Sequence, residues 1–339
     1  MTMSARPGRS NTILDIAGLK VGNAQDRRVR TGVTVVLPDA PCMAGVDVRG
    51  GAPGTCEIDL LDPMNTVDAV HALVLSGGSA FGLDGMGAIR ARLATRKIGF
   101  EIKDAVVPIV PGAVLFDLVN GGDKDWGEDP PFRRLALEAL ERAGAPLELG
   151  SVGAGAGAVA GTVAGGLGSA SAVCPVTGCT VAALIAVNSV GEPGFPDDRT
   201  FYAWYLEQDG ELGGQTPPEG PVSLALRGKI GAVAGANTTI GVVATDAKLT
   251  KAQARRMAVM AHDGLAVSIR PIHTPFDGDT IFALATARRD LAVTAEALTR
   301  LGALAADCTA RAVARGVLAA GRLGSTPSWR ERAAGGDVG

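Results

Sequence analysis

The segment at 239–244, Thr-Ile-Gly-Val-Val-Ala, places the strongest constraint on the fold of this chain. It is short, apolar and rich in β-branched residues, a pattern typical of a strand buried in the core. Small, flexible residues and Asn237 precede it, so the hydroxyl of Thr238 lies where the chain enters a rigid element. Thr238 is therefore placed to attack the carbonyl carbon of its own preceding peptide bond.

Such an attack would leave Thr238 with a free α-amine beside its hydroxyl. A threonine hydroxyl is a weak nucleophile until a base takes its proton, and an N-terminal amine is a recognised base for it. The α-amino group titrates at about 7.7–8.0, which is close to working pH. The alternative is that Thr238 and Thr239 are ordinary strand residues, because threonine is common in strands.

The charge and hydropathy of the chain argue against several classes of partner. The 32 Lys and Arg nearly balance the 35 Asp and Glu, so the net charge of -3 disfavours a general nucleic-acid binder and gives no electrostatic reason for membrane attachment. No apolar run approaches the roughly 20 residues of a membrane-spanning helix, and the N-terminus lacks the apolar segment of a secretory signal. We expect a soluble, cytoplasmic protein.

Glycine and cysteine usage add two further expectations. The 47 glycines and an aromatic content of 4% predict many close backbone contacts and a core of Ala, Val, Leu and Ile. The five cysteines have no C-x-x-C spacing and the chain has only 3 histidines, so we expect reduced thiols and no metal site. A G-x-G-x-x-A pattern at 155–160 lacks the acidic residue expected about 20 positions later, so no dinucleotide cofactor is predicted.

Two other glycine-rich loops follow predicted strands. The loop at 49–55 is expected to be a plain turn. At 76–83, Phe81 stands where a G-x-S-x-G nucleophile motif needs glycine. The backbone amides of Gly77 and Gly78 could still bind an oxyanion or a substrate carboxylate at a helix start.

Hydrophobic patterns predict the remaining elements. Strands are expected at 12–16, 33–37, 44–48, 72–75, 106–110, 170–173, 180–187 and 281–285, and helices at 83–94, 133–143, 249–267 and 292–322. The polar, Pro- and Gly-rich stretch at 191–221 is expected to be a linker, and the tail at 330–339 to be disordered.

Three polar residues lie at predicted strand ends. The Asn188 amide follows the strand at 180–187 and is well placed to donate to an oxyanion, although Asn also forms turns. Asp277 and Asp279 flank a glycine before the strand at 281–285, where they could bind calcium, orient an ammonium group or cap the turn.

Several motifs, taken in order, resemble those of the DmpA-like aminopeptidases and amidases, which include β-peptidyl aminopeptidases and nylon-oligomer hydrolases. They are Asp-Val-Arg-Gly-Gly-Ala-Pro-Gly at 47–54, Ser-Gly-Gly-Ser-Ala-Phe-Gly-Leu at 76–83, Gly-Gly-Leu-Gly-Ser-Ala-Ser at 165–171, Asn-Thr-Thr-Ile at 237–240, Ala-Thr-Asp-Ala at 244–247 and His-Thr-Pro-Phe-Asp-Gly-Asp-Thr at 273–280. The resemblance covers nearly the whole chain.

This resemblance implies an α+β fold, a four-layer αββα sandwich of the type shared with ornithine acetyltransferases. It implies one hydrolase domain over 1–339 that cleaves itself into 1–237 and 238–339, and assembly of the cleaved pairs into a homo-oligomer, expected to be a tetramer. Thr238 would be the nucleophile, Asn237–Thr238 the scissile bond and Asn188 the oxyanion donor. Asp277 and Asp279 would form the polar pair near the nucleophile.

The chain departs from the family pattern at three positions. The nylon-oligomer hydrolases carry a lysine and a tyrosine in their sites, and the corresponding residues here are Thr162 and Phe116, both expected to contact substrate. Other members have Lys-Gly-Gly at 164–166, where this chain has Ala-Gly-Gly. Without these groups, proton transfer is expected to depend on the Thr238 amine and the two aspartates.

The resulting hypothesis is a self-cleaving peptide or amide hydrolase that acts on small peptide or amide substrates without a cofactor. Two alternatives remain open. An enzyme of the ornithine acetyltransferase type would pass its acyl group to an amine instead of water. A non-catalytic binding protein would use the glycine-rich loops and stay one intact chain.

Overall fold

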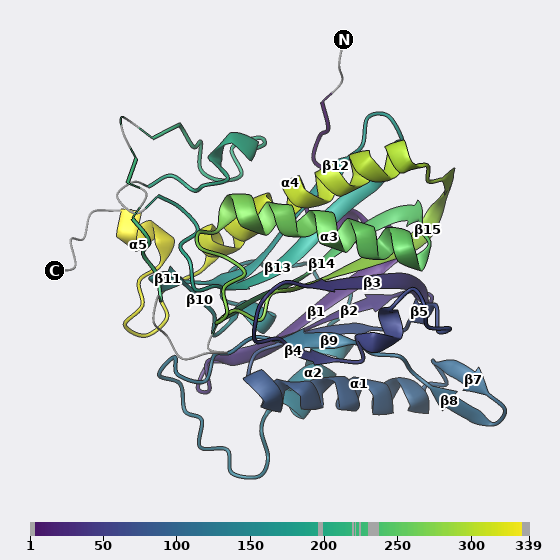
Figure 1. Ribbon diagram of the computed structural model, residues 1–339. Helices are drawn as coiled ribbons and strands as arrows, with labels where there is room; N and C mark the ends of the chain where they lie inside the picture. Colours follow the sequence, from purple (N-terminus) through teal and green to yellow (C-terminus); the bar gives the residue numbers. More distant parts are fainter. Residues whose placement is uncertain are drawn as a thin grey trace.

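The computed structural model describes residues 4–195, 199–218, 220, 222–223, 225–229 and 237–333. Two large β-sheets pack face to face, and a pair of helices covers the outer face of each (Figure 1). The arrangement is the four-layer α+β sandwich that the motif resemblance implies.

The first sheet carries Thr238. Its strands lie in the order β12 (Gly166–Val173), β13 (Thr180–Asn188), β14 (Thr238–Lys248), β15 (Thr280–Ala292), β3 (Cys42–Val48) and β5 (Ala69–Val70). β13 is antiparallel to β12 and β14, whereas β14 and β15 are parallel. Helices α3 (Lys251–Ser268) and α4 (Ala295–Ala319) cover its outer face (Figure 1).

The second sheet supplies one wall of the candidate site. Its strands lie in the order β1 (Leu19–Asp26), β2 (Thr31–Pro38), β6 (Leu73–Ser76), β9 (Gly112–Val114) and β4 (Gly54–Cys56). Helices α1 (Asp84–Thr95) and α2 (Phe132–Glu141) cover it. The smaller elements are β7 (Phe100–Ile102), β8 (Ala105–Val107), β10 (Val159–Ala160), β11 (Val163–Ala164) and α5 (Trp329–Ala333).

The apolar layer between the sheets surrounds β14. Ile240 and Val242 on this strand belong to the same buried cluster as Leu73 and Leu75 of β6 and Phe282 of β15. Every residue of β14 except the last is buried. The sequence correctly predicted a core strand here, and burial of its apolar side chains fixes the point at which the strand begins.

Glycine allows the helices to pack tightly against the first sheet. A Cβ atom at Gly168 of β12 would lie 1.9 Å from the carbonyl oxygen of Ala312 and 2.5 Å from the amide of Gly316, both in α4. Only a residue without a side chain fits between these two backbones.

Two predicted strands differ in the structure. The expected strand at 12–16 is a 3-10 helix, Ile13–Asp15, because Thr12 and Asp15 form a capping box that satisfies the amides at its start. The expected strand at 106–110 is only partly formed: β8 ends at Val107 and pairing resumes in β9, with Pro108 and Pro111 between them. Proline cannot donate a hydrogen bond to a neighbouring strand.

The segments expected to be unstructured are partly ordered. The stretch at 191–221 contains the 3-10 helix Trp204–Leu206 and buried Phe201, whose ring stacks on Trp329 with centroids 4.1 Å apart. Trp329 opens α5, so 330–333 are helical. Residues 196–198, 219, 221 and 334–339 of these two predictions lie outside the described residues. Within the described part of the chain, none of the helices has the length and apolar character needed to cross a bilayer.

We predict that Gly168→Ala destabilises the protein, because the added methyl group must displace α4 from the sheet. Overpacking of this kind costs roughly 1–3 kcal/mol, which would lower the midpoint of urea-induced unfolding. Gly321→Ala is the matched control, since a Cβ atom at Gly321 would meet nothing within 4 Å. Equal midpoints for the two variants would contradict the packing argument.

Candidate functional site

Thr238 is the first residue of β14, and its preceding peptide bond is held on two sides. The residue is buried and lies opposite Asn188 in the β13–β14 register. Its Oγ1 donates to the carbonyl oxygen of Asn237, and the amide of Gly278 donates to the same oxygen at 3.1 Å. A Cβ atom at Gly278 would come within 2.7 Å of the Thr238 hydroxyl, so glycine is needed for this approach.

Asp279, the residue before the neighbouring strand β15, fixes the start of β14. Its side chain is fully buried, and Oδ1 accepts a hydrogen bond from the amide of Thr239 at 2.7 Å. Oδ2 accepts from the amide of His273 at 3.1 Å and lies 2.8 Å from its Nδ1. These donors satisfy a carboxylate that would otherwise be costly to bury.

Asp277 joins two loops around the same point. Oδ2 accepts from the amide of Thr274 at 3.0 Å and from its hydroxyl at 2.7 Å, while Oδ1 accepts from the amide of Val190 at 3.2 Å. Burial, with Asp279 close by, raises the pKa of the Asp277 carboxyl. Both predicted aspartates thus lie beside Thr238 and bind donors of the protein itself.

Asn188 connects β13 to two neighbouring segments. Its Oδ1 accepts from the amide of Val159 at 2.9 Å, and its Nδ2 donates to the carbonyl of Phe116 at 2.9 Å. An amide nitrogen carries two hydrogens, so one remains for a further acceptor. Asn188, Phe116, Val159 and Asn237 line one cavity of about 560 Å³.

Three residues predicted to contact substrate are engaged elsewhere. The exposed Thr162 donates its amide to Glu192 at 2.8 Å and does not line the cavity. The amides of Gly77 and Gly78 donate to the carbonyl of Gly32 at 2.9 Å and to the Asp117 carboxylate at 2.8 Å. The carboxylate expected at this helix start is therefore the protein's own, and these two amides are not available to a substrate.

Another residue of the cavity wall, Lys229, was not predicted from the sequence. Its Nζ donates to the carbonyl of Val159 at 2.8 Å, next to the amide that holds Asn188. Burial lowers the pKa of Lys229 to about 7, while the charges of Asp277 and Glu192 oppose the shift. No periodicity or motif marks this lysine, because its position depends on pairing between Gly228 and Gly191.

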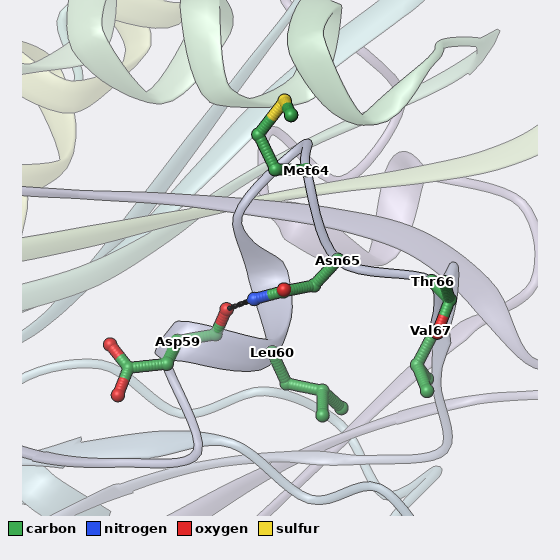
Figure 2. Close-up of a pocket in the computed structure, with 6 residues that line it drawn as sticks. All are labelled: Asp59, Leu60, Met64, Asn65, Thr66 and Val67. Carbon is green, nitrogen blue, oxygen red and sulfur yellow. Dashed lines mark hydrogen bonds between the residues drawn. The ribbon is translucent and has the colours of Figure 1, made fainter.

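A second cavity, of about 350 Å³, lies in the loop between β4 and β5 and contains none of the predicted site residues. Its lining residues are Asp59, Leu60 and the run at 64–67 (Figure 2). The loop closes on itself through a hydrogen bond from Asn65 Nδ2 to the carbonyl of Asp59. We therefore place the candidate site at the cavity next to Thr238.

A buried histidine supports the loop that carries Asp279. The ring of His262 in α3 lies edge-on to that of His273, with centroids 4.9 Å apart, and its Nε2 is 3.0 Å from the carbonyl oxygen of Asp47. Burial lowers the pKa of His262 to about 4, and the charge on His273 acts in the same direction, while those of Asp47 and Asp279 oppose it. His262 is thus neutral in the folded protein at neutral pH.

This burial predicts a pH dependence of stability. The folded pKa of His262 is below the unfolded value of about 6.5, so its contribution is complete above pH 6.5 and is lost as the pH falls towards 4. The loss by pH 5 should be roughly 2 kcal/mol, measured as the difference between urea unfolding free energies at pH 7.5 and 5. His262→Gln should lose less over the same interval; equal losses would refute the assignment.

Comparison with known proteins identifies relatives over nearly the full length. The model of Peptidase family S58 matches residues 11–327. An uncharacterized aminopeptidase of Mycobacterium tuberculosis is 43% identical, with 95% of this chain and 97% of the relative covered. A 6-aminohexanoate-oligomer endohydrolase of Kocuria sp. is 29% identical, with 85% and 78% covered.

Solved structures share the fold. A beta-aminopeptidase from Burkholderia sp. aligns with a TM-score of 0.69 at 23% identity, covering 94% of this chain and 90% of that one. The L-aminopeptidase D-Ala-esterase/amidase from Ochrobactrum anthropi, described as a variant of the Ntn hydrolase fold, aligns with a TM-score of 0.67 at 20% identity, covering 94% and 89%. The resemblance found in the motifs is confirmed, and the chain belongs to Peptidase family S58.

Proposed function

We propose that the protein is a self-processing aminopeptidase or amidase whose nucleophile is the hydroxyl of Thr238. The observation that carries this proposal is the arrangement of the Asn237–Thr238 bond, whose carbonyl oxygen accepts from both the Thr238 hydroxyl and the Gly278 amide. An amide donor at a carbonyl under attack stabilises the negative charge that develops on its oxygen.

In self-cleavage, the Thr238 hydroxyl gives up its proton as Oγ1 forms a bond to the carbonyl carbon of Asn237. The Gly278 amide donates to the oxyanion, the proton released by the hydroxyl is transferred to the nitrogen of Thr238, and the C–N bond breaks so that this nitrogen leaves as an amine. Water hydrolyses the resulting ester to give the Asn237 carboxylate and restore the hydroxyl. The products are 1–237 and 238–339.

In the mature enzyme, the α-amine of Thr238 takes the hydroxyl proton as the hydroxyl attacks a substrate carbonyl. Asn188 and the Gly278 amide donate to the oxyanion, and water releases the acyl group. Asp279 acts as a positioning residue, since its carboxylate holds the Thr239 amide next to the new terminus. Asp277 has a comparable role on the loop of Val190.

The family relationship supports hydrolysis over acyl transfer to an amine and over binding alone. The names of the relatives associate the family with aminopeptidase activity and with hydrolysis of 6-aminohexanoate oligomers. We accordingly propose small peptides or amides as the substrate class. Assembly of the cleaved pairs into a homo-oligomer stays a prediction.

We predict that Thr238→Ala abolishes both self-cleavage and amide hydrolysis, because no other group replaces the attacking hydroxyl. The intact mass of purified protein should show two species for the wild type and one for the variant. The smaller wild-type piece should begin Thr-Thr-Ile. Thr238→Ser keeps a hydroxyl and should still cleave. A wild-type chain that stays full-length for days, or activity in Thr238→Ala, would rule the mechanism out.

We predict that Asn188→Ala lowers kcat by about 10²–10³-fold, the usual effect of removing one oxyanion donor, with a smaller change in KM. Kinetics on the cleaved enzyme would measure both parameters. Asn65→Ala is the matched control, since it also removes a bond from an Asn side chain to a backbone carbonyl, but at the other cavity. An effect on KM alone would assign Asn188 to substrate binding instead.

A further inference from the structure

We propose that the cavity beside Thr238 selects substrates whose acyl residue, the one transferred to the hydroxyl, carries a side-chain carboxylate, and that Lys229 and Arg30 recognise this carboxylate. The proposal rests on the proposed function, because it takes Thr238 as the nucleophile. It specifies a substrate class that the family relationship leaves open.

Self-cleavage identifies which cavity faces the acyl residue. In that reaction Asn237 is the acyl residue, because its carbonyl carbon is the one attacked. Asn237 is fully buried and lines the 560 Å³ cavity. Its side-chain oxygen and nitrogen have no hydrogen-bond partner among the described residues. A substrate attacked by the same hydroxyl brings its own carbonyl to the same place, so its acyl side chain faces the same cavity.

Two basic side chains, Lys229 and Arg30, belong to the cavity wall. Lys229 Nζ donates to the Val159 carbonyl at 2.8 Å, and Arg30 Nη1 donates to the Asn120 carbonyl at 2.9 Å. Over the described ranges, neither forms an ion pair with a carboxylate. A neutral carbonyl orients such a group but leaves its charge uncompensated, which favours an anion beside it.

The acidic groups near the cavity are already engaged. Asp117 lies in the wall, but its oxygens accept from Thr31 Oγ1 at 2.6 Å and from the Gly78 amide at 2.8 Å. Burial raises the pKa of Asp117, against the opposing charge of Lys124. Asp117 therefore contributes less negative charge than a free carboxylate would.

The two carboxylates whose charges act on Lys229, those of Glu192 and Asp277, are also engaged. Glu192 accepts from the Arg332 guanidinium at 2.7 Å and from the Thr162 amide at 2.8 Å. Asp277 is held by Thr274 and Val190. These carboxylates therefore do not neutralise both Lys229 and Arg30, so the cavity favours binding of one carboxylate from a substrate.

The backbone holds Lys229 at this position. Its amide donates to the carbonyl of Val190 at 3.0 Å, and Gly228 pairs with Gly191. Gly228 has φ +116°, and a Cβ atom there would lie 2.3 Å from the Val190 carbonyl oxygen, so glycine permits the pairing. Lys229 thus lies against Val190 and Gly191, the residues just after β13, at the same end of the strand as Asn188.

The test compares the p-nitroanilides of glutamate, glutamine and lysine with the cleaved wild-type enzyme. Glutamate and glutamine have nearly the same shape, so their ratio isolates the charge. We expect kcat/KM for glutamate to exceed that for glutamine by about ten-fold, as when a charge-assisted hydrogen bond replaces a neutral one, and lysine to be the poorest substrate. The preference should fall as the pH rises above about 7, where Lys229 loses its proton.

Variants assign the preference to its residues. Arg30→Met and Lys229→Met should each reduce the glutamate-to-glutamine ratio towards one. Arg27→Met, a change of an exposed arginine three positions from Arg30, should retain it. If Lys229→Met does not cleave itself, the proposal is tested by the glutamate-to-glutamine ratio of Arg30→Met and by the pH dependence of this ratio in the wild type.

The outcomes separate the inference from the proposed function. A cleaved enzyme that hydrolyses glutamine and glutamate anilides equally, or prefers lysine, overturns the anionic subsite and leaves the nucleophile assignment intact. A cleaved enzyme that hydrolyses none of these anilides, nor those of alanine and leucine, overturns both.

Discussion

The candidate site depends on one hydrogen bond, from the amide of Thr239 to the buried carboxylate of Asp279. The parallel pairing of β14 with β15 begins at Ile240 and Thr280. The side chain of Asp279 adds one more link between the two strands before Ile240, because it binds the amide of Thr239. Thr238 is therefore held in place although it does not itself pair with β15. Because the other Asp279 oxygen is held by His273, the carboxylate itself cannot easily move.

Glycine shapes both the layers and the site by allowing backbones to approach closely. The loop at 49–54, expected to be a plain turn, lies against the aspartate loop, with Ala52 donating to the carbonyl of Asp277 at 2.8 Å. A Cβ atom at Gly50 would lie 2.4 Å from the Asp277 oxygen and from the Asp279 nitrogen. The first sheet meets α3 in the same way, since a Cβ atom at Gly45 would be 2.3 Å from the amide of Arg255. The high glycine content and the scarcity of aromatic residues thus both follow from close packing of backbones, which leaves little space for large side chains.

Hydrophobic runs and helical periodicity in the sequence predicted the buried strands and the helices that cover the first sheet. β2, β13 and β14 are apolar runs, and α3 and α4 have helical periodicity, so their burial follows from sequence. β1 was missed because Lys20, Asn23 and Gln25 interrupt its apolar positions. Motif resemblance brought Thr238, Asn188, Asp277 and Asp279 together, and the structure places them around one peptide bond. It could not reveal Lys229 or Arg30, whose places in the cavity wall depend on contacts between distant segments.

Lys229 brings an amine to the cavity although the lysine that the nylon-oligomer hydrolases carry is replaced here by Thr162. Thr162 stands at that position and does not line the cavity, but the Lys229 amine contacts Val159, three residues earlier in the same hairpin. The cavity therefore contains an ammonium group although the expected segment does not supply it. Since burial lowers the pKa of this amine to about 7, its protonation is incomplete at neutral pH. A bound carboxylate would favour the protonated form, so the lysine becomes fully charged only with the anion that it recognises.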